Sequence, residues 1–136
     1  MHWTVSDVPA VVRVGRALAY ERAPSGPLHF TEEFSEAASA DLRFTSGCLQ
    51  FLPETLSERL AALPQWPRLL VNLLPLHEAW AYCPYRIQHA ATFFSELEAL
   101  GYQVIDCWDN LEKQCWIAFE PEHSLDRYCG AVLRLG

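Results

Sequence analysis

The fold of this 136-residue chain is limited above all by a short apolar run, RLLVNLLPL, at residues 68–76. The run is far shorter than the ~20 residues of a helix that crosses a membrane, and Asn72 and Pro75 interrupt it. Its length and its leucine and valine content are typical of a central strand that is buried on both faces. We therefore expect a layered fold in which helices cover a sheet, and no membrane contact.

Helical and extended patterns alternate around this run. Helical spacing of apolar residues predicts helices at residues 7–22, 31–42, 53–63 and 87–100, and a last helix from Ser124 onward. β-favouring patterns predict a strand or a short hairpin about Ser46-Gly47 at residues 43–52, and a strand at residues 68–76. They also predict a hairpin at residues 102–119 with its turn at 109–112. Together these elements predict a single α+β domain over residues 1–136, with a largely antiparallel sheet of roughly four strands and helices packed on one face. A ferredoxin-like arrangement is the nearest familiar fold.

The composition indicates a globular, acidic protein. Hydrophobic residues make up 51% of the chain and charged residues 20%, which excludes a disordered segment. The formal net charge is -7, and the acidic excess lies beyond residue 30. Such a field repels nucleic acid, and it favours either a basic protein partner or solubility alone.

Cysteine usage and the start of the chain indicate the compartment. The five cysteines are odd in number and share no CxxC spacing: Cys48, Cys83, Cys107, Cys115 and Cys129. The first residues lack the basic start and the long apolar stretch of a secretory signal. We therefore expect a cytoplasmic protein whose cysteines are buried free thiols.

The predicted hairpin at residues 102–119 has two differently built faces. Alternation places one set of side chains against the helices: Ile105, Cys107, Cys115, Ile117 and Phe119. The opposite face then carries Asp106, Trp108, Gln114 and Trp116. Exposed tryptophans are typical interface anchors, and nearby carboxylates can bind the arginines of a partner. We therefore predict a protein-binding surface of Asp106, Trp108, Asp109, Glu112 and Trp116. The alternative is that both tryptophans belong to the core.

A second acidic cluster lies on the helix predicted at residues 31–42. Glu32, Glu33 and Glu36 fall on one side of that helix and form a compact negative patch. They are the second candidate contact for a basic partner, and a solvated helix face is the alternative.

The segment at residues 77–89 holds the side chains best suited to chemistry. His77, Glu78, Cys83 and His89 are metal-ligand types, but two histidines twelve residues apart do not form an HExxH motif. Cys83 near the two histidines is the only local candidate for a nucleophile. Because the sequence has no phosphate-binding glycine loop, dinucleotide fingerprint or nucleophile elbow, we expect no catalytic residue, metal or cofactor.

The features above predict a small cytoplasmic binding protein rather than an enzyme. It would occlude a basic toxin or nuclease, as bacterial immunity proteins and antitoxins do, with tryptophan anchors and acidic partners for basic residues. Two alternatives remain open. One is a small enzyme or ligand-binding protein that uses the aromatic, histidine and cysteine side chains of residues 77–89. The other is an adaptor or self-associating subunit that pairs through a sheet edge.

Overall fold

The computed structural model describes the chain except for residues 38, 64–67, 78–80, 83–85, 117 and 120. The described residues form two compact units, Met1–Ala40 and Asp41–Gly136. The mixed α+β class predicted from the sequence is confirmed. The expectation of a single domain stays a prediction. No helix among the described residues is long and apolar enough to cross a membrane.

The first unit is a small β-α-β element. Strand β1 (Trp3–Ser6) and strand β2 (Leu28–Thr31) pair in parallel, and helix α1 (Pro9–Arg22) connects them. The helix packs on β2 at Gly15, because the ring of Phe30 fills the space that a Cβ would need there. The helix predicted at residues 7–22 is thus confirmed.

The prediction of a helix at residues 31–42 is wrong. The described residues of this range form a short 3-10 turn, η1 (Phe34–Ala37), and Thr31 ends strand β2. Instead of capping a helix, the Thr31 Oγ1 accepts a hydrogen bond from the Glu33 backbone N–H at 3.0 Å. This local turn competes with helix formation, as serine and threonine side chains often do.

The second unit is built on a four-stranded sheet. Its strands are β3 (Leu42–Ser46), β4 (Arg68–Leu74), β8 (Tyr102–Asn110) and β9 (Tyr128–Leu135), in the order β3-β4-β9-β8. Strands β3 and β4 pair in parallel, and β9 pairs antiparallel with both β4 and β8. Therefore β3, β4 and β8 all run in one direction, and β9 is reversed between two of them. The number of strands agrees with the prediction, and β3, β4 and β8 lie where strands were predicted, but β9 does not. The ferredoxin-like arrangement is not found, because a ferredoxin-like sheet would have no parallel pair.

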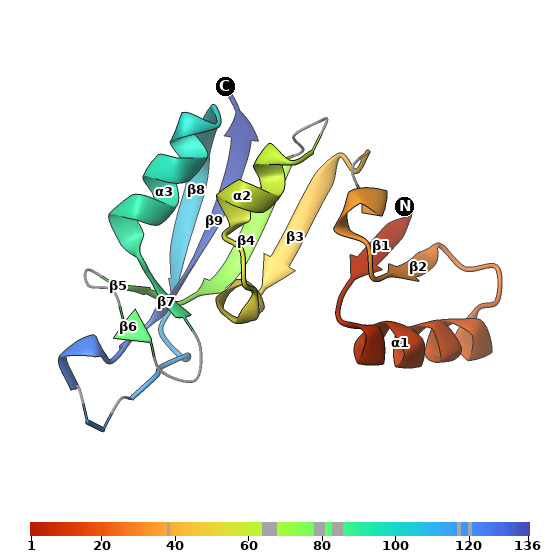
Figure 1. The fold of residues 1–136 in the computed structure, drawn as a ribbon, viewed down its shortest axis with the longest axis horizontal. Coiled ribbons are helices and arrows are strands. Elements are labelled where there is room, and N and C mark those ends of the chain that lie inside the picture. The colour runs from red at the N-terminus through yellow and green to blue at the C-terminus, as the bar shows by residue number, and fades with distance from the viewer. Residues whose placement is uncertain (38, 64–67, 78–80, 83–85, 117, 120) are drawn as a thin grey trace. The chain divides into compact units, whose positions relative to one another are not determined.

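Two helices cover one face of this sheet (Figure 1). Helix α2 (Leu56–Ala61) begins with a capping box in which Thr55 and Glu58 bond each other's backbone N–H groups. Helix α3 (Ala90–Ala99) ends at Gly101, whose φ of 88° is the left-handed conformation expected for a helix end. The core beneath the helices consists of Leu49, Leu56, Leu60, Leu63, Leu69, Val71, Leu74, Leu76, Phe93, Leu97, Tyr102, Leu125, Ala131 and Leu133.

A second, small sheet follows the carboxyl end of β4 (Figure 1). It consists of β5 (Leu76–His77), β7 (Arg86–His89) and β6 (Ala81–Tyr82), in the order β5-β7-β6. The 3-10 turn η2 (Leu49–Phe51) lies beside β7. Segments that follow β3 and β4 in the sequence therefore gather at the same end of the main sheet.

The last third of the chain corrects two predictions. Residues 114–119 do not form the return strand of a hairpin; the described part of residues 111–127 is irregular, with a 3-10 turn η3 (Pro121–His123) and a bridge between Cys115 and Leu125. The partner of β8 is β9, in the region predicted to be the final helix. This segment forms a strand and not a helix because residues 128–135 form backbone hydrogen bonds with a strand on each side and bury Ala131 and Leu133.

The distribution of side chains between the two faces of β8 also differs from the prediction. A register shift between Val104 and Asp106 interrupts the regular alternation. Ile105 and Cys107, which we expected against the helices, are exposed. Phe119, expected on the same buried face, is 98% exposed, and Ile117 lies outside the described residues.

Candidate functional site

The carboxyl ends of three strands are joined by hydrogen bonds to one side chain, that of Asn72. Asn72 lies near the end of β4, between Ser46 at the end of β3 and Asn110 at the end of β8. Its Oδ1 accepts hydrogen bonds from Asn110 Nδ2 at 3.0 Å and from Trp108 Nε1 at 3.2 Å. Its Nδ2 donates a longer bond to Ser46 Oγ at 3.5 Å. We call these four residues, Ser46, Asn72, Trp108 and Asn110, the polar edge.

The backbone beneath the polar edge is irregular. Leu73 has a φ of 52°, the only non-glycine residue among those described with a positive φ. The pairing of β4 with β9 shifts between Val71 and Leu74, so that the strand bulges where Asn72 stands. On the neighbouring strand, Gly47 has a φ of 65° and its N–H donates to the Asn72 carbonyl at 3.1 Å. Left-handed backbone at a bulky residue costs about 1–3 kcal/mol and is concentrated at functional sites.

Trp108 contacts its own sheet. Its indole lies over Gly130 on β9, where a side chain would collide with the ring. The indole is half-buried, and its N–H is engaged by Asn72. Trp108 is therefore held in one orientation at the polar edge, with part of its surface exposed.

Two histidines from the predicted 77–89 site are brought together. His77 on β5 and His89 on β7 are direct neighbours across the parallel pair, and both are half-buried. His89 also caps α3, because its Nδ1 accepts the Thr92 backbone N–H at 3.4 Å. An acceptor role for Nδ1 places the proton of the neutral ring on Nε2, which can then donate a hydrogen bond.

Two buried glutamines lie next to these elements. Gln50 on η2 and Gln88 on β7 are among the few buried polar side chains of the described chain. Gln50 Oε1 and Gln88 Nε2 each lack a hydrogen-bond partner among the described residues. Buried polar atoms are normally bonded, so this end of the sheet holds unused hydrogen-bonding capacity. Neither glutamine could be singled out from the sequence, because glutamines are usually exposed.

The structure does not describe the remaining residues of the site predicted at residues 77–89. Glu78, Cys83, Trp80 and Tyr85 fall outside the described residues, as does the side chain of Tyr82. Within the described chain, no three histidine, cysteine or acidic side chains are grouped so that they could hold a metal.

The described cysteines are free thiols but not deeply buried. Cys48 and Cys107 are exposed, while Cys115 and Cys129 are half-buried, so the expectation of burial is wrong for them. Burial raises the pKa of the Cys129 thiol, and the neighbouring Asp109 carboxylate adds to this effect. Cys129 Sγ lies 3.8 Å from Asp109 Oδ1.

The residues predicted to bind a partner do not form one described surface. Asp106, Asp109, Glu112 and Trp116 are exposed, but Trp116 lies in the irregular segment and not on a strand beside Trp108. Asp109 also forms a 3.5 Å ion pair with Arg127. That a protein contacts these residues stays a prediction.

The second predicted patch is in the first unit. Glu32, Glu33 and Glu36 are exposed, but no helix aligns them. Hydrogen bonding to Thr31, and then to His29, lowers the pKa of the Glu36 carboxyl, which lies 3.5 Å from His29 Nε2. One member of the acidic patch, Glu36, therefore already interacts with neighbouring residues of the first unit.

Comparison with known proteins gives no relative by sequence and several by fold. No family model matches the chain, and no curated protein matches it. The crystal structure of the cyclase SpnF matches over 99% of this chain and 67% of SpnF, with a TM-score of 0.67 and 17% identity. The chain shares the fold of SpnF. A structure described as a pericyclic reaction enzyme and one of LepI in complex with SAM each match over 99% of this chain, with TM-scores of 0.55 and 10% identity.

These matches correct the functional prediction. The chain was expected to be a non-enzymatic inhibitor of the immunity-protein or antitoxin kind, but the proteins that share its fold are enzymes. The alternative of a small enzyme or ligand-binding protein agrees better with this fold. The chain spans only 36% of LepI and of the pericyclic reaction enzyme.

Proposed function

We propose that this chain is part of an enzyme that binds a small organic molecule at the polar edge. The observation that carries the proposal is the Asn72 side chain, which joins polar groups from the carboxyl ends of β3, β4 and β8. In open α/β sheets, ligands bind outside the carboxyl ends of the strands. The fold shared with SpnF and with the pericyclic reaction enzyme supports the enzyme class.

The chemistry of the polar edge suits orientation of a neutral substrate. Its groups are a hydroxyl, two amides and an indole, all neutral at ordinary pH. Cyclisation of the pericyclic kind moves electrons around a ring and requires no nucleophile, so a site can act by fixing the reacting geometry and by donating hydrogen bonds to a polarised carbonyl. The exposed Ser46 hydroxyl and the exposed part of the Trp108 ring are the groups that would touch such a substrate.

The described residues do not fit a SAM ligand. Asp7 lies directly after β1, where a nucleotide-binding fold has its glycine-rich turn, and not about 20 residues further on, where an acidic residue binds ribose hydroxyls; its Oδ1 accepts the Val8 N–H at 2.7 Å. The sequence lacks the glycine-rich loop that lets a backbone approach such a ligand closely. The described residues therefore do not make up a complete SAM site, and the proposal rests on the polar edge.

We place this enzyme in the cytoplasm. The support is that all four described cysteines are free thiols, two of them exposed, which suits a reducing compartment.

Nuclear magnetic resonance can test the proposed site directly. The Trp108 indole N–H and the side-chain amides of Asn72 and Asn110 each give a separate signal, so three reporters lie at the polar edge. The labelled protein would be titrated with SAM, with SAH and with a panel of small apolar molecules that carry one carbonyl group. We expect at least one panel member to shift these three signals together, and Ser46→Ala to weaken its binding. Gln103→Ala, at the other end of β8, is the matched control. If no compound shifts the three signals, the proposal is wrong.

A further inference from the structure

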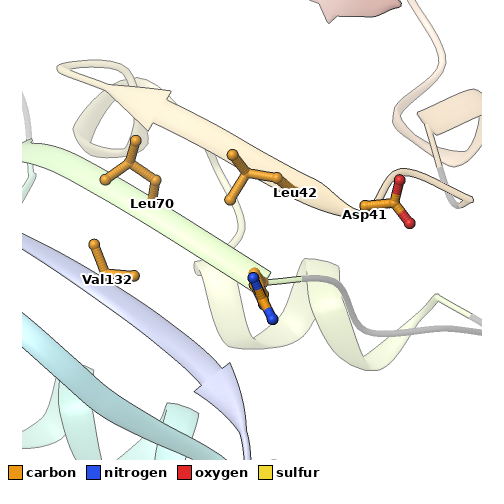
Figure 2. Close-up of a pocket in the computed structure, with 5 residues that line it drawn as sticks. Asp41, Leu42, Leu70 and Val132 are labelled. Carbon is orange, nitrogen blue, oxygen red and sulfur yellow. The ribbon is translucent and has the colours of Figure 1, made fainter. Parts of the chain in front are cut away.

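A separate hollow lies at the opposite end of the sheet, on the face without α2 and α3 (Figure 2). It has a volume of about 590 Å³ and is lined by Asp41, Leu42, Arg68, Leu70 and Val132. Figure 2 shows the three aliphatic side chains on neighbouring strands, with Asp41 directly before β3. Arg68 begins β4, four residues before Asn72, so the charged end of the hollow is about 13 Å along the strand from Asn72, and Leu70 is about 7 Å from it.

The floor of the hollow is apolar because of strand register. Leu42 is paired with Arg68, and Leu70 with Val132, so the lining side chains stand on one face of three adjacent strands. The side chains between them, such as Leu69 and Val71, turn to the other face and are buried. Leu42 remains 46% exposed, which leaves apolar surface open to a ligand.

Two opposite charges stand at the rim. The Arg68 backbone N–H donates to the Asp41 carbonyl at 3.1 Å, which holds the two residues side by side. Their side chains do not form an ion pair with each other, and within the described chain no ion pair or side-chain hydrogen bond engages either of them. A carboxylate and a guanidinium that line the same hollow and are not paired can each bind a charge on a ligand.

From these observations we infer that the hollow binds a small zwitterion with an apolar body, of the kind that an aliphatic α-amino acid represents. The guanidinium of Arg68 binds the ligand carboxylate, and a guanidinium can do so through two parallel hydrogen bonds. The carboxylate of Asp41 binds the ammonium group. Leu42, Leu70 and Val132 contact the hydrocarbon part.

The dimensions and composition agree with this ligand class. Small-molecule sites are typically ~300–1,000 Å³ in volume, mostly apolar, with a few polar groups that fix orientation. Three aliphatic side chains and one charge of each sign match that description. The inference is independent of the proposed function, because no residue is shared with the polar edge.

Titration of the full chain with four matched compounds tests the inference. L-Leucine carries both charges and an aliphatic side chain. Its analogue 4-methylpentanoate lacks the ammonium group, 3-methylbutylamine lacks the carboxylate, and glycine lacks the side chain. We expect leucine to shift the backbone amide signals of Leu42, Leu70 and Val132, and each analogue to bind at least about tenfold more weakly, because each loses one charge-assisted contact or the apolar contact.

Single substitutions measure the contribution of each charge to ligand binding separately. Arg68→Gln should weaken leucine binding about tenfold or more, and Asp41→Asn should do the same. Both residues are exposed, so neither change removes core packing, and Arg13→Gln in the first unit is the matched control. Equal binding of leucine and 4-methylpentanoate would overturn the zwitterion assignment. Failure of leucine to shift the lining amides at millimolar concentration, or binding unchanged in both variants, would overturn the site itself.

Discussion

The indole of Trp108 lies directly over Gly130, its register partner on the neighbouring strand. Only a residue without a side chain at position 130 leaves room for the ring. The contact orients the indole so that its N–H reaches Asn72 Oδ1 at 3.2 Å. A glycine in the middle of a strand, which weakens pairing by itself, is thus used to hold a tryptophan at the polar edge.

We predict that Gly130→Ala destabilises the protein by about 1–3 kcal/mol, because the new methyl group must displace the Trp108 ring. Chemical unfolding monitored by circular dichroism measures the loss. The double variant Gly130→Ala with Trp108→Ala should be less destabilised than the sum of the two single variants, since the collision is gone. Gly136→Ala is the control, as the flexible Gln103 side chain next to it can move away. Full additivity would mean that the two residues do not interact.

Asn72→Ala tests the centre of the polar edge. The change removes the acceptor for Trp108 and Asn110 and the donor to Ser46. We expect a loss of about 1–3 kcal/mol in the free energy of unfolding, since each neutral hydrogen bond contributes roughly 0.5–1.5 kcal/mol. The indole N–H resonance of Trp108 should also move toward the position of a solvent-exposed indole. An unchanged indole signal in a folded variant would show that Asn72 does not hold the tryptophan.

Local elements were predictable from the sequence, and long-range pairings were not. The end of α3 at Gly101 and the strand β4 follow from neighbouring residues, and both are confirmed. The expected burial of β4 on both faces is not, because Leu70 and Asn72 on the second face are only half-buried. The segment after Ser124 carries an apolar pattern that suits a helix as well as a strand. The segment forms strand β9 and not a helix because it pairs with β4, which is far away in the sequence.

The polar edge could not be predicted from the sequence either, because it also depends on the pairing of strands that are far apart in the chain. In the sequence, Asn72 only interrupts an apolar run and Asn110 belongs to a predicted turn. Their connection depends on the order β3-β4-β9-β8, which brings the ends of separate strands together. An asparagine inside an otherwise buried strand is the one signal that the sequence offers, because a buried amide needs partners. The pair His77 and His89 was named in advance, but its geometry comes from the pairing of β5 with β7.

Gly47→Ala should destabilise the protein by about 1 kcal/mol through the backbone alone. The φ of 65° at Gly47 is strained for alanine, while the nearest atoms to a new Cβ are those of Leu73 at an ordinary 3.6 Å. Gly47→Asn should cost less, because asparagine tolerates the left-handed conformation. Thermal unfolding of the three proteins gives the order of stability. Equal losses for alanine and asparagine would indicate a steric cause instead.

The half-buried thiol of Cys129 makes stability depend on pH. Burial, and then the carboxylate of Asp109, raises the pKa of this thiol in the folded protein. A raised folded pKa means that the folded state keeps its proton longer than the unfolded state. The resulting stabilisation is fully present below the ordinary thiol pKa of about 8.5 and is lost as the pH rises through the raised pKa.

The free energy of unfolding should therefore fall between about pH 8 and about pH 9.5, and Cys129→Ala should fall less over this range. Denaturant unfolding at a series of pH values under reducing conditions measures both slopes. Cys48→Ala, which changes an exposed thiol, should follow the parent protein. Burial also raises the pKa of Tyr102, which keeps the titration of this tyrosine above the range. If the slope of Cys129→Ala equals that of the parent, the thiol is not the group that titrates.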